Sequence, residues 1–161
     1  MIPEIKKILY ATDLSENARY AFGYAVSLAN RYGAGMTLLH VLEDSPSGDS
    51  LVINMIGEQR WKELRNTNEK KVIETFRERL EKFCADVSAE LPACPFITDE
   101  IIVKTGNSTE EILRQADKKG FDLVVMGSHG ANSLAKAVMG STARRVVRRC
   151  KKPVLVVRLP E

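Results

Sequence analysis

The sequence has no long run of apolar residues, and none approaches the ~20 consecutive residues that a membrane-spanning helix needs. Its first seven residues also lack the apolar core and the small-residue cleavage site of a secretion signal. Three cysteines are present without a Cys-x-x-Cys pair, so neither a disulfide framework nor a zinc site is indicated. We therefore expect a cytoplasmic protein that does not contact membranes.

The sequence also has little net charge and few aromatic residues. The formal net charge is +3, and aromatic residues make up 6% of the chain. Such a small excess of positive charge does not by itself indicate a nucleic-acid-binding protein. The motif Gly-x-x-x-x-Gly-Lys-Ser/Thr is missing, which excludes a Walker A loop and its lysine, a common stabiliser of charge in phosphoryl transfer.

The regular pattern of the chain is an alternation of short apolar segments with longer amphipathic ones. The 161 residues are enough for one domain with a sizeable core. We predict five strands, at residues 5–11, 36–42, 98–104, 121–127 and 153–158. We predict helices from Ser15, a plausible N-cap, to Gly33, and over residues 58–91, 107–119 and 141–152. Strands that alternate with helices indicate an α/β fold whose parallel sheet has helices on both faces.

Two of the predicted helices have a clear apolar side. In the first helix the residues on this side are Ala18, Ala21, Phe22, Ala25, Val26 and Ala29. In the last helix they are Ala143, Val146, Val147 and Cys150. The last helix and the residues after it also carry a basic cluster, made up of Arg144, Arg145, Arg148, Arg149, Lys151 and Lys152. A solvated face is the default interpretation of this cluster, and a nucleic-acid or acidic-partner surface is the alternative. No aromatic residues are interleaved to stack on bases.

The most informative motif is Gly127-Ser-His-Gly130, followed after nine residues by Gly140-Ser141-Thr142. It lies between a predicted buried strand and the last helix. Glycines allow close approach of the backbone and positive φ, and the N-terminus of a helix attracts anions. The motif therefore predicts a site for a phosphate chain, although tight turns alone would also require glycine.

Three other side chains are candidates for a site. Asp13 follows the first strand, where its carboxylate can contact a ribose, coordinate a divalent metal or cap the next helix. His129 lies inside the glycine loop and can donate to a phosphate, act as an acid or base, or have no special task. We interpret His40, near the end of an apolar strand, as a buried histidine with a satisfied hydrogen bond. Because ligands bind at the C-terminal ends of parallel strands, Asp13, Val41 and Gly127 should converge there.

These motifs resemble the universal stress protein family over essentially the whole chain. The residues that carry the resemblance are Ile8-Leu-Tyr-Ala-Thr-Asp13-Leu-Ser15, the alanine-rich first helix, His40-Val41, Gly106-Asn-Ser-Thr-Glu-Glu-Ile112, Asp122-Leu-Val-Val-Met-Gly127-Ser-His-Gly130, Gly140-Ser141, Val146 and Pro153-Val-Leu-Val156. The spacing of the glycines is typical of the nucleotide-binding branch of that family. The resemblance implies a Rossmann-like fold with sheet order 3-2-1-4-5, in one domain over residues 1–161 with a variable insert at about 43–66.

The resemblance also implies which residues contact a nucleotide. Val41 would sandwich the adenine and hydrogen-bond it through the main chain, though a plain buried strand residue is an equal interpretation from residue type alone. The full set of implied contacts is Ala11, Thr12, Asp13, Val41, Met126, Gly127, Ser128, His129, Gly130, Gly140, Ser141 and Thr142. The implied ligand is ATP, or ADP or AMP, with Mg²⁺ or Mn²⁺ at Asp13 as an option. The strand at 154–157 is implied to pair with its two-fold mate in a homodimer.

The function that we expect from this sequence is that of an ATP-binding regulatory protein with at most slow hydrolysis. Two alternatives stay open. One is a metal-dependent ATPase or nucleotidyl-transfer enzyme that uses a metal at Asp13 together with His129. The other is a binder of nucleic acid or of an acidic partner through the basic cluster of the last helix.

Overall fold

The computed structural model describes residues 1–43, 53–67, 69–90, 97–118, 120–130, 138–158 and 160. Its strands are β1 (Lys7–Thr12), β2 (Gly35–Leu42), β3 (Ile97–Thr105), β4 (Leu123–Gly127) and β5 (Val154–Val157). Its helices are α1 (Glu16–Tyr32), α3 (Glu58–Thr67), α4 (Glu69–Glu90), α5 (Ser108–Lys118) and α6 (Ser141–Arg149). A single helical turn lies at residues 53–56. No described helix is long and apolar enough to cross a membrane.

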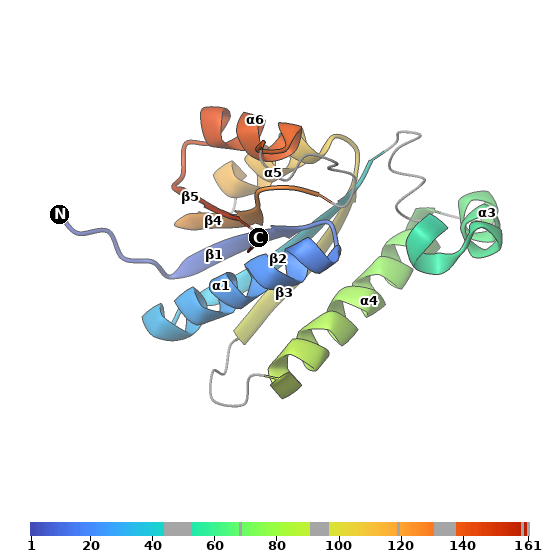
Figure 1. The fold of residues 1–161 in the computed structure, drawn as a ribbon, viewed down its shortest axis with the longest axis horizontal. Helices are drawn as coiled ribbons and strands as arrows, with labels where there is room; N and C mark the ends of the chain where they lie inside the picture. The colour runs from blue at the N-terminus through green and yellow to red at the C-terminus, as the bar shows by residue number, and fades with distance from the viewer. Residues whose placement is uncertain are drawn as a thin grey trace.

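The five strands form one sheet in the order β3-β2-β1-β4-β5, and every neighbouring pair is parallel. This confirms the predicted fold class and strand order (Figure 1). Central strand β1 sets the register, since its residue Ala11 lies opposite Leu39 of β2 and Met126 of β4. From β1 the chain goes first to β2 and β3 on one side and later to β4 and β5 on the other. The C-terminal end of β1 is therefore a topological switch point, where ligands of open α/β sheets bind.

The core is divided between the two faces of the sheet because side chains alternate along each strand. In β1, Ile8 and Tyr10 pack against α1 and α4, whereas Leu9 and Ala11 pack against α5 and α6. Figure 1 shows these two helical layers on opposite sides of the sheet. Every strand residue of β1 after Lys7 is buried, as the near-continuous apolar sequence of a doubly covered parallel strand requires.

The ends of α1 agree with the sequence signals. Ser15 is the N-cap, and its side chain accepts a hydrogen bond of 3.2 Å from the amide of Ala18. Gly33 ends the helix in the left-handed conformation, with φ of 61°. The six residues predicted for its apolar side are all buried. At the start of α5, the amide of Glu110 donates to Asn107 Oδ1 at 3.1 Å, as one half of a capping box does.

Three expectations about the helices are corrected. The single helix predicted over residues 58–91 is two helices, α3 and α4, and α3 ends on the weak helix formers Asn66 and Thr67. Helix α6 ends at Arg149 rather than Lys152, because the chain must turn before Val154 pairs with Val124. Val147 was expected on the buried side of α6 but is 44% exposed, because the short helix rests on the sheet mainly through Ala143 and Val146.

Candidate functional site

A cavity of about 400 Å³ opens at the C-terminal ends of β1, β2 and β4, beside the N-termini of α5 and α6. All twelve residues that the sequence implied as ligand contacts line it. They are Ala11, Thr12, Asp13, Val41, Met126, Gly127, Ser128, His129, Gly130, Gly140, Ser141 and Thr142. They are separated by up to 131 positions in the chain, from residue 11 to residue 142, and come together because parallel strands end at the same edge.

The loop after β4 is held in place by backbone hydrogen bonds. The amide of Ser128 donates to the carbonyl oxygen of Val157 in β5 at 2.8 Å, and the amide of Gly140 donates to the carbonyl oxygen of Ser128 at 2.8 Å. The two ends of the loop thus meet directly above β4. Residues 131–137, between them, lie outside the described residues.

The glycines of this loop serve close approach and not an unusual backbone conformation. None of Gly127, Gly130 and Gly140 has positive φ, so that part of the sequence expectation is wrong. A Cβ atom at Gly130 would lie 2.9 Å from Oδ2 of Asp13, and one at Gly140 would lie 3.2 Å from the carbonyl oxygen of Ser128. Both distances are shorter than side-chain contacts normally permit. A side chain at position 130 would therefore displace either the loop or the carboxylate of Asp13.

Asp13 is fixed by the turn that joins β1 to α1. Its Oδ1 accepts hydrogen bonds from the amide of Ser15 at 3.0 Å and from the hydroxyl of Ser15 at 2.5 Å. The helix cap is therefore Ser15, and Asp13 supports the cap from two positions before it. The residue between them, Leu14, has φ of 62°, which is uncommon for a bulky side chain. The turn aims Oδ2 of Asp13 toward Gly130, across the mouth of the cavity.

Helix α6 presents its positive end to the cavity. Its N-cap is Gly140, which has no side chain to satisfy the free amides of the first turn, and Ser141 and Thr142 follow with hydroxyl groups. These amides and the helix dipole favour an anion. No lysine or arginine is among the described residues that line the cavity. Backbone amides and hydroxyls are thus the donors for a phosphate chain here.

An apolar wall faces these polar groups. Leu39 and Val41 of β2, Ile112 of α5, Met126 of β4 and Ala143 of α6 all line the cavity. Val41 is half-buried, so part of its surface is open to a ligand. A flat apolar group such as a nucleobase fits against such a wall, and polar groups at its edge would set its orientation.

His40 is buried and satisfied, as expected from its place near the strand end. Its Nδ1 lies 2.8 Å from the carbonyl oxygen of Thr12, which can only accept, so Nδ1 carries the hydrogen. Its ring stacks on Phe76 of α4 with centroids 5.0 Å apart. Burial lowers the pKa of His40 and favours the neutral ring, although the bond to Thr12 opposes this shift. His40 also lines the cavity, which the sequence did not predict.

His129 has a different environment from His40. Its Nδ1 shares a hydrogen bond of 2.7 Å with the hydroxyl of Ser128, which is itself buried. Its Nε2 is buried and has no hydrogen-bond partner among the described residues. A buried polar atom without a partner is destabilising unless a ligand or water satisfies it. This favours the interpretation that His129 contacts a bound group.

Sequence reasoning missed several residues that line the cavity. Glu43 directly follows β2, and its Oε1 accepts a hydrogen bond of 3.3 Å from the amide of Ser108 at the start of α5. Its position at the C-terminal end of a predicted strand could have indicated that Glu43 lies at the site. Met55 and Phe76 come from the helical turn at 53–56 and from α4, and no local motif connects them with the site.

The candidate metal ligand Asp13 has no cluster of similar ligands around it. Among the described residues, no group of three histidine, cysteine, aspartate or glutamate side chains is arranged to hold a metal ion. A divalent cation at Asp13 would therefore need phosphate oxygens and water as its other ligands. This is the usual way in which Mg²⁺ is held next to a nucleotide.

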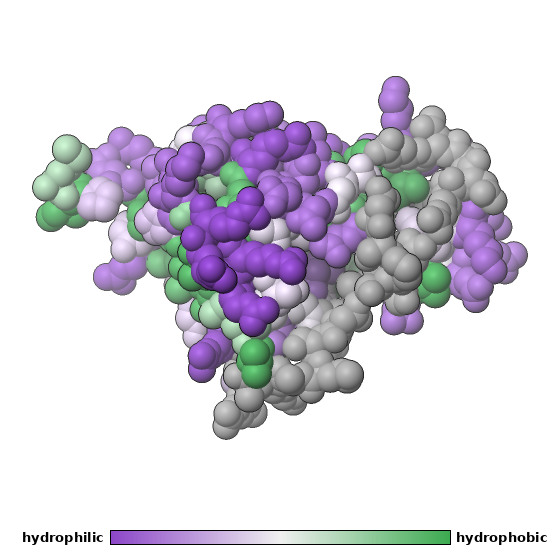
Figure 2. Space-filling model, turned by 90° about the horizontal axis from the view of Figure 1, so that it is seen from above, coloured by the Kyte–Doolittle hydropathy of each residue, from purple (hydrophilic) through white to green (hydrophobic). Residues whose placement is uncertain are grey.

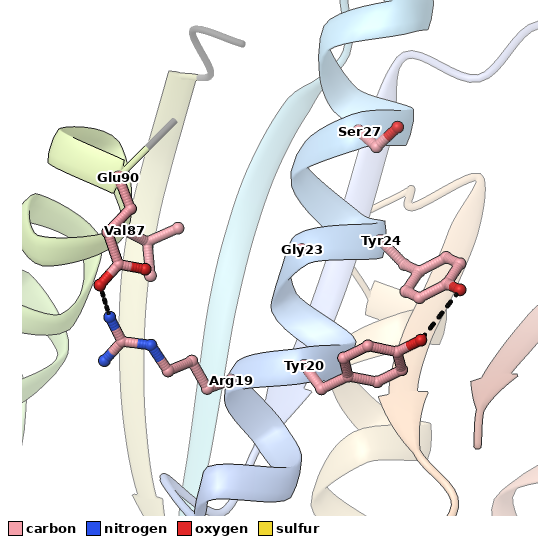
Figure 3. Close-up of a pocket in the computed structure, with 7 residues that line it drawn as sticks. All are labelled: Arg19, Tyr20, Gly23, Tyr24, Ser27, Val87 and Glu90. Atoms are coloured by element: carbon pink, nitrogen blue, oxygen red, sulfur yellow. Dashed lines mark hydrogen bonds and ion pairs between the residues drawn. The ribbon is translucent and has the colours of Figure 1, made fainter. Parts of the chain in front are cut away.

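A second, more open groove of about 400 Å³ lies between α1 and the C-terminal part of α4, away from the cavity (Figure 3). On one side Arg19 reaches across to pair with Glu90, next to Val87. On the other side Tyr20 and Tyr24 point away from α4, with their hydroxyls 3.3 Å apart. Gly23 and Ser27 lie between the two sides. The groove contains neither a glycine loop nor a helix N-terminus.

Gly23 lies in the middle of α1, and a Cβ atom there would meet nothing within 4 Å. We expect Gly23→Ala to raise the free energy of unfolding by about 0.5–1 kcal/mol, because alanine restricts the unfolded chain and favours the helix. Thermal unfolding measures this gain. Gly33→Ala is the matched control, since the left-handed conformation of Gly33 should make it destabilising by about 1–2 kcal/mol. A loss of stability in Gly23→Ala would contradict the prediction.

The sequence matches the universal stress protein family over residues 4–158. It is 32% identical over 158 residues to the universal stress protein MJ0577 of Methanocaldococcus jannaschii, which covers 95% of this chain and 94% of the relative. The solved structure of MJ0577 aligns with a TM-score of 0.70 and 30% identity over 99% of each chain. Universal stress protein UspA from Lactobacillus plantarum aligns with a TM-score of 0.67 and 25% identity over 98% of this chain and 100% of that one.

A universal stress protein solved in complex with cAMP aligns with a TM-score of 0.65 over 96% of this chain and 98% of that one. At 17% identity this likeness shows the fold alone. The match to the family covers nearly the whole chain, and the sheet order agrees with it. The chain therefore belongs to the universal stress protein family.

Proposed function

We propose that this protein binds ATP, or its products ADP and AMP, in the cavity at the switch point and that it acts as a nucleotide-dependent regulatory protein. The observation that carries the proposal is the arrangement of one cavity with two chemically different sides. Amides of the glycine loop and of the first turn of α6 face one side, and the apolar wall forms the other. A volume of about 400 Å³ is within the range of small-molecule sites.

Each part of an adenine nucleotide has a matching surface in this arrangement. The base lies against Val41 and Met126 and hydrogen-bonds the main chain of β2. The phosphates lie at Gly130 and Ser141, where glycine allows close approach and the helix dipole favours negative charge. The carboxylate of Asp13 contacts the ribose or, together with phosphate oxygens, a divalent cation.

The same arrangement supports slow hydrolysis at most. Phosphoryl transfer is fast when cations neutralise the charge that develops on the transferred group. The described lining of the cavity has no lysine or arginine, and Asp13 with Glu43 provides its only carboxylates. Since the Oδ1 of Asp13 already accepts two hydrogen bonds from Ser15, this carboxylate is better placed to hold a ligand than to activate water.

Isothermal titration calorimetry with ATP, GTP and inorganic triphosphate tests the proposal. We expect saturable binding of ATP in the presence of Mg²⁺ and much weaker binding of triphosphate, which has no base for the apolar wall. GTP should bind more weakly than ATP because the edge of guanine offers different donors and acceptors to the main chain of β2. Release of phosphate should be below one turnover per minute in the same samples. Equal affinity for ATP and triphosphate would show that the apolar wall does not bind a base, and no binding of any of them would refute the proposal.

We further propose that the protein forms a homodimer through β5. This strand is at the edge of the sheet, and its residues Val154, Leu155 and Val156 are only half-buried. An exposed apolar edge strand normally needs a cover. Pairing with the same strand of a second copy would bury these residues on both sides of a two-fold axis.

Introducing a charge into β5 should therefore give a monomer. We expect Val156→Glu to lower the sedimenting mass from dimer to monomer at micromolar concentration, because a carboxylate would be buried without a partner in the interface. Val147→Glu is the matched control, since Val147 is 44% exposed on α6, and it should leave the mass unchanged. A dimer that persists in Val156→Glu would place the interface elsewhere.

A further inference from the structure

Helix α6 has an outward side that does not take part in the cavity. Arg144, Arg145 and Arg148 are exposed there, and with Val147 they form what we call the arginine face. Figure 2 views the molecule from the side of α5 and α6, and strongly hydrophilic residues gather on this surface. Three cations within five positions of one helix repel one another unless negative charge comes near.

Two other cations of the basic cluster are already paired. Nη1 and Nη2 of Arg149 lie 2.6 and 3.3 Å from the two carboxylate oxygens of Glu110, and Lys151 Nζ lies 3.3 Å from Asp117 Oδ2. These pairs connect α6 to α5 and hold it in place. In the part of the chain that the structure describes, no acidic side chain forms an ion pair with Arg144, Arg145 or Arg148. Arg149 therefore has a structural role in holding α6 on α5, whereas the described residues show no such role for the three arginines of the arginine face.

Val147 indicates what kind of anion fits this surface. It is 44% exposed and lies one turn from Arg144 and directly before Arg148, so an exposed apolar side chain lies beside the arginines. A nucleic-acid backbone offers phosphates but no apolar group to cover a valine, and no aromatic side chain on α6 is available to stack on bases. A protein segment can offer carboxylates and an apolar side chain together.

We propose that the arginine face is a docking surface for an acidic amphipathic segment of a partner protein. Arg144 and Arg148 are four positions apart, so their Cβ atoms are about 6 Å apart on the same side of the helix. Carboxylates on a partner helix at the same spacing match them, and arginine binds carboxylate through two parallel hydrogen bonds. An apolar side chain between those carboxylates covers Val147.

The position of α6 connects this surface with the cavity, and this step rests on the proposed function. The helix begins at Ser141 among the phosphate-binding groups, and Arg144 to Arg148 lie about 4–10 Å further along its axis at 1.5 Å per residue. This distance is comparable with the screening length at physiological salt. Bound ATP brings three to four negative charges to the first turn, or about two when Mg²⁺ is bound with it, and so weakens the attraction of the arginine face for carboxylates. The nucleotide-free protein is then the form with higher affinity for the partner.

Fluorescence anisotropy with a labelled synthetic peptide tests the docking surface. The peptide is a helix-forming 16-mer with glutamates four positions apart on both sides of a leucine, and its glutamine analogue is the reference. At 50 mM NaCl we expect Arg144→Glu/Arg148→Glu to weaken binding about tenfold or more, since attraction becomes repulsion at two positions. Arg60→Glu/Lys82→Glu is the control, because it changes the net charge equally on exposed positions of α3 and α4. It should change the affinity less than about twofold.

Two further measurements separate the possible outcomes. Val147→Ala should lower the affinity for the peptide about threefold, because the peptide covers Val147. It should leave the affinity for a 12-residue oligothymidylate unchanged, because the oligonucleotide does not cover this side chain. If the oligonucleotide binds more tightly than the peptide and Val147→Ala changes neither, the surface is a nucleic-acid site and the proposal is wrong. An equal loss in the two charge-reversal variants would show that net charge alone attracts the peptide, and this also overturns it.

Saturating ATP should lower the affinity for the peptide about fivefold at 50 mM NaCl. At 300 mM NaCl the change should be small, because salt screens the charge effect. Calorimetry in the same buffer shows whether ATP is bound. If ATP binds and the affinity for the peptide does not change, the connection through α6 is wrong although the proposed function stands. If ATP does not bind, the proposed function fails. The charge-reversal variants then still show whether the arginine face binds the acidic peptide.

Discussion

Replacement of Gly130 by valine is expected to lower the affinity for ATP at least a hundredfold. A Cβ atom at this position would lie 2.9 Å from Oδ2 of Asp13, and the two γ-methyl groups of valine would extend further into the space between the loop and that carboxylate. Because the other carboxylate oxygen is held by Ser15, either the loop moves away from β1 or the Asp13 turn is disturbed, and in both cases the groups around the phosphates lose their alignment. Positioning errors of this kind remove several charge-assisted hydrogen bonds at once.

The effect should be specific to the site and graded with side-chain size. Gly130 is exposed, so valine there should change the free energy of unfolding by less than about 1 kcal/mol. Gly130→Ala should lower the affinity for ATP about tenfold. Gly23→Ala should leave this affinity unchanged, because a Cβ atom at position 23 meets nothing within 4 Å. Calorimetry gives the affinities and thermal unfolding the stabilities. ATP binding of wild-type strength by Gly130→Val would show that the phosphates lie elsewhere.

The sequence predicts the sheet and the position of the site well because both depend on local signals that agree. Buried parallel strands are short and apolar on both faces, and the alternation with helices restricts the topology to very few arrangements. Once the resemblance implied the order 3-2-1-4-5, the ends of β1, β2 and β4 had to meet. Asp13, Val41 and Gly127 were therefore predicted at one edge, although nothing in their own segments connects them.

The features that the sequence did not predict depend on contacts between distant segments. Phe76 lines the cavity because α4 packs on β2 and its ring stacks on His40, and the helical pattern of α4 predicts burial but not the partner. The requirement for Gly130 is likewise a contact with Asp13 across the site and not a property of its own backbone. A Gly-x-x-Gly spacing alone does not separate these two reasons.

The division of α3 from α4 illustrates the same limit. Apolar residues at helical spacing lie at Trp61 and Leu64 and again from Val72 to Val87, and treating them as one stripe predicts one helix although residues 65–71 are all polar. What separates the two helices is packing, because α4 follows the sheet while α3 turns away from it (Figure 1). The helical turn at 53–56 then reaches the cavity through Met55. This region thus adds the side chain of Met55 to the site, and no sequence motif predicts that contact.

Removal of the charge on Asp13 should lower the affinity for ATP mainly when a divalent cation is present. Asp13→Asn keeps an oxygen that accepts the hydrogen bonds from Ser15, so the turn before α1 is preserved. The amide no longer binds a cation but can donate to a phosphate oxygen. We expect the affinity to fall about thirtyfold with Mg²⁺ and less than about threefold with EDTA, as loss of one anionic ligand of Mg²⁺ requires. Calorimetry under both conditions measures the difference.

Ser15→Ala separates the carboxylate from the turn that supports it. This variant retains the charge of Asp13 but removes the helix cap, so the free energy of unfolding should fall by about 0.5–2 kcal/mol while the ratio of affinities with and without Mg²⁺ stays as in the wild type. An equal loss of affinity in Asp13→Asn with Mg²⁺ and with EDTA would mean that the carboxylate contacts the ribose hydroxyls. In that case the divalent cation has no place at Asp13, and the phosphates are held by amides and hydroxyls of the glycine loop and α6 alone.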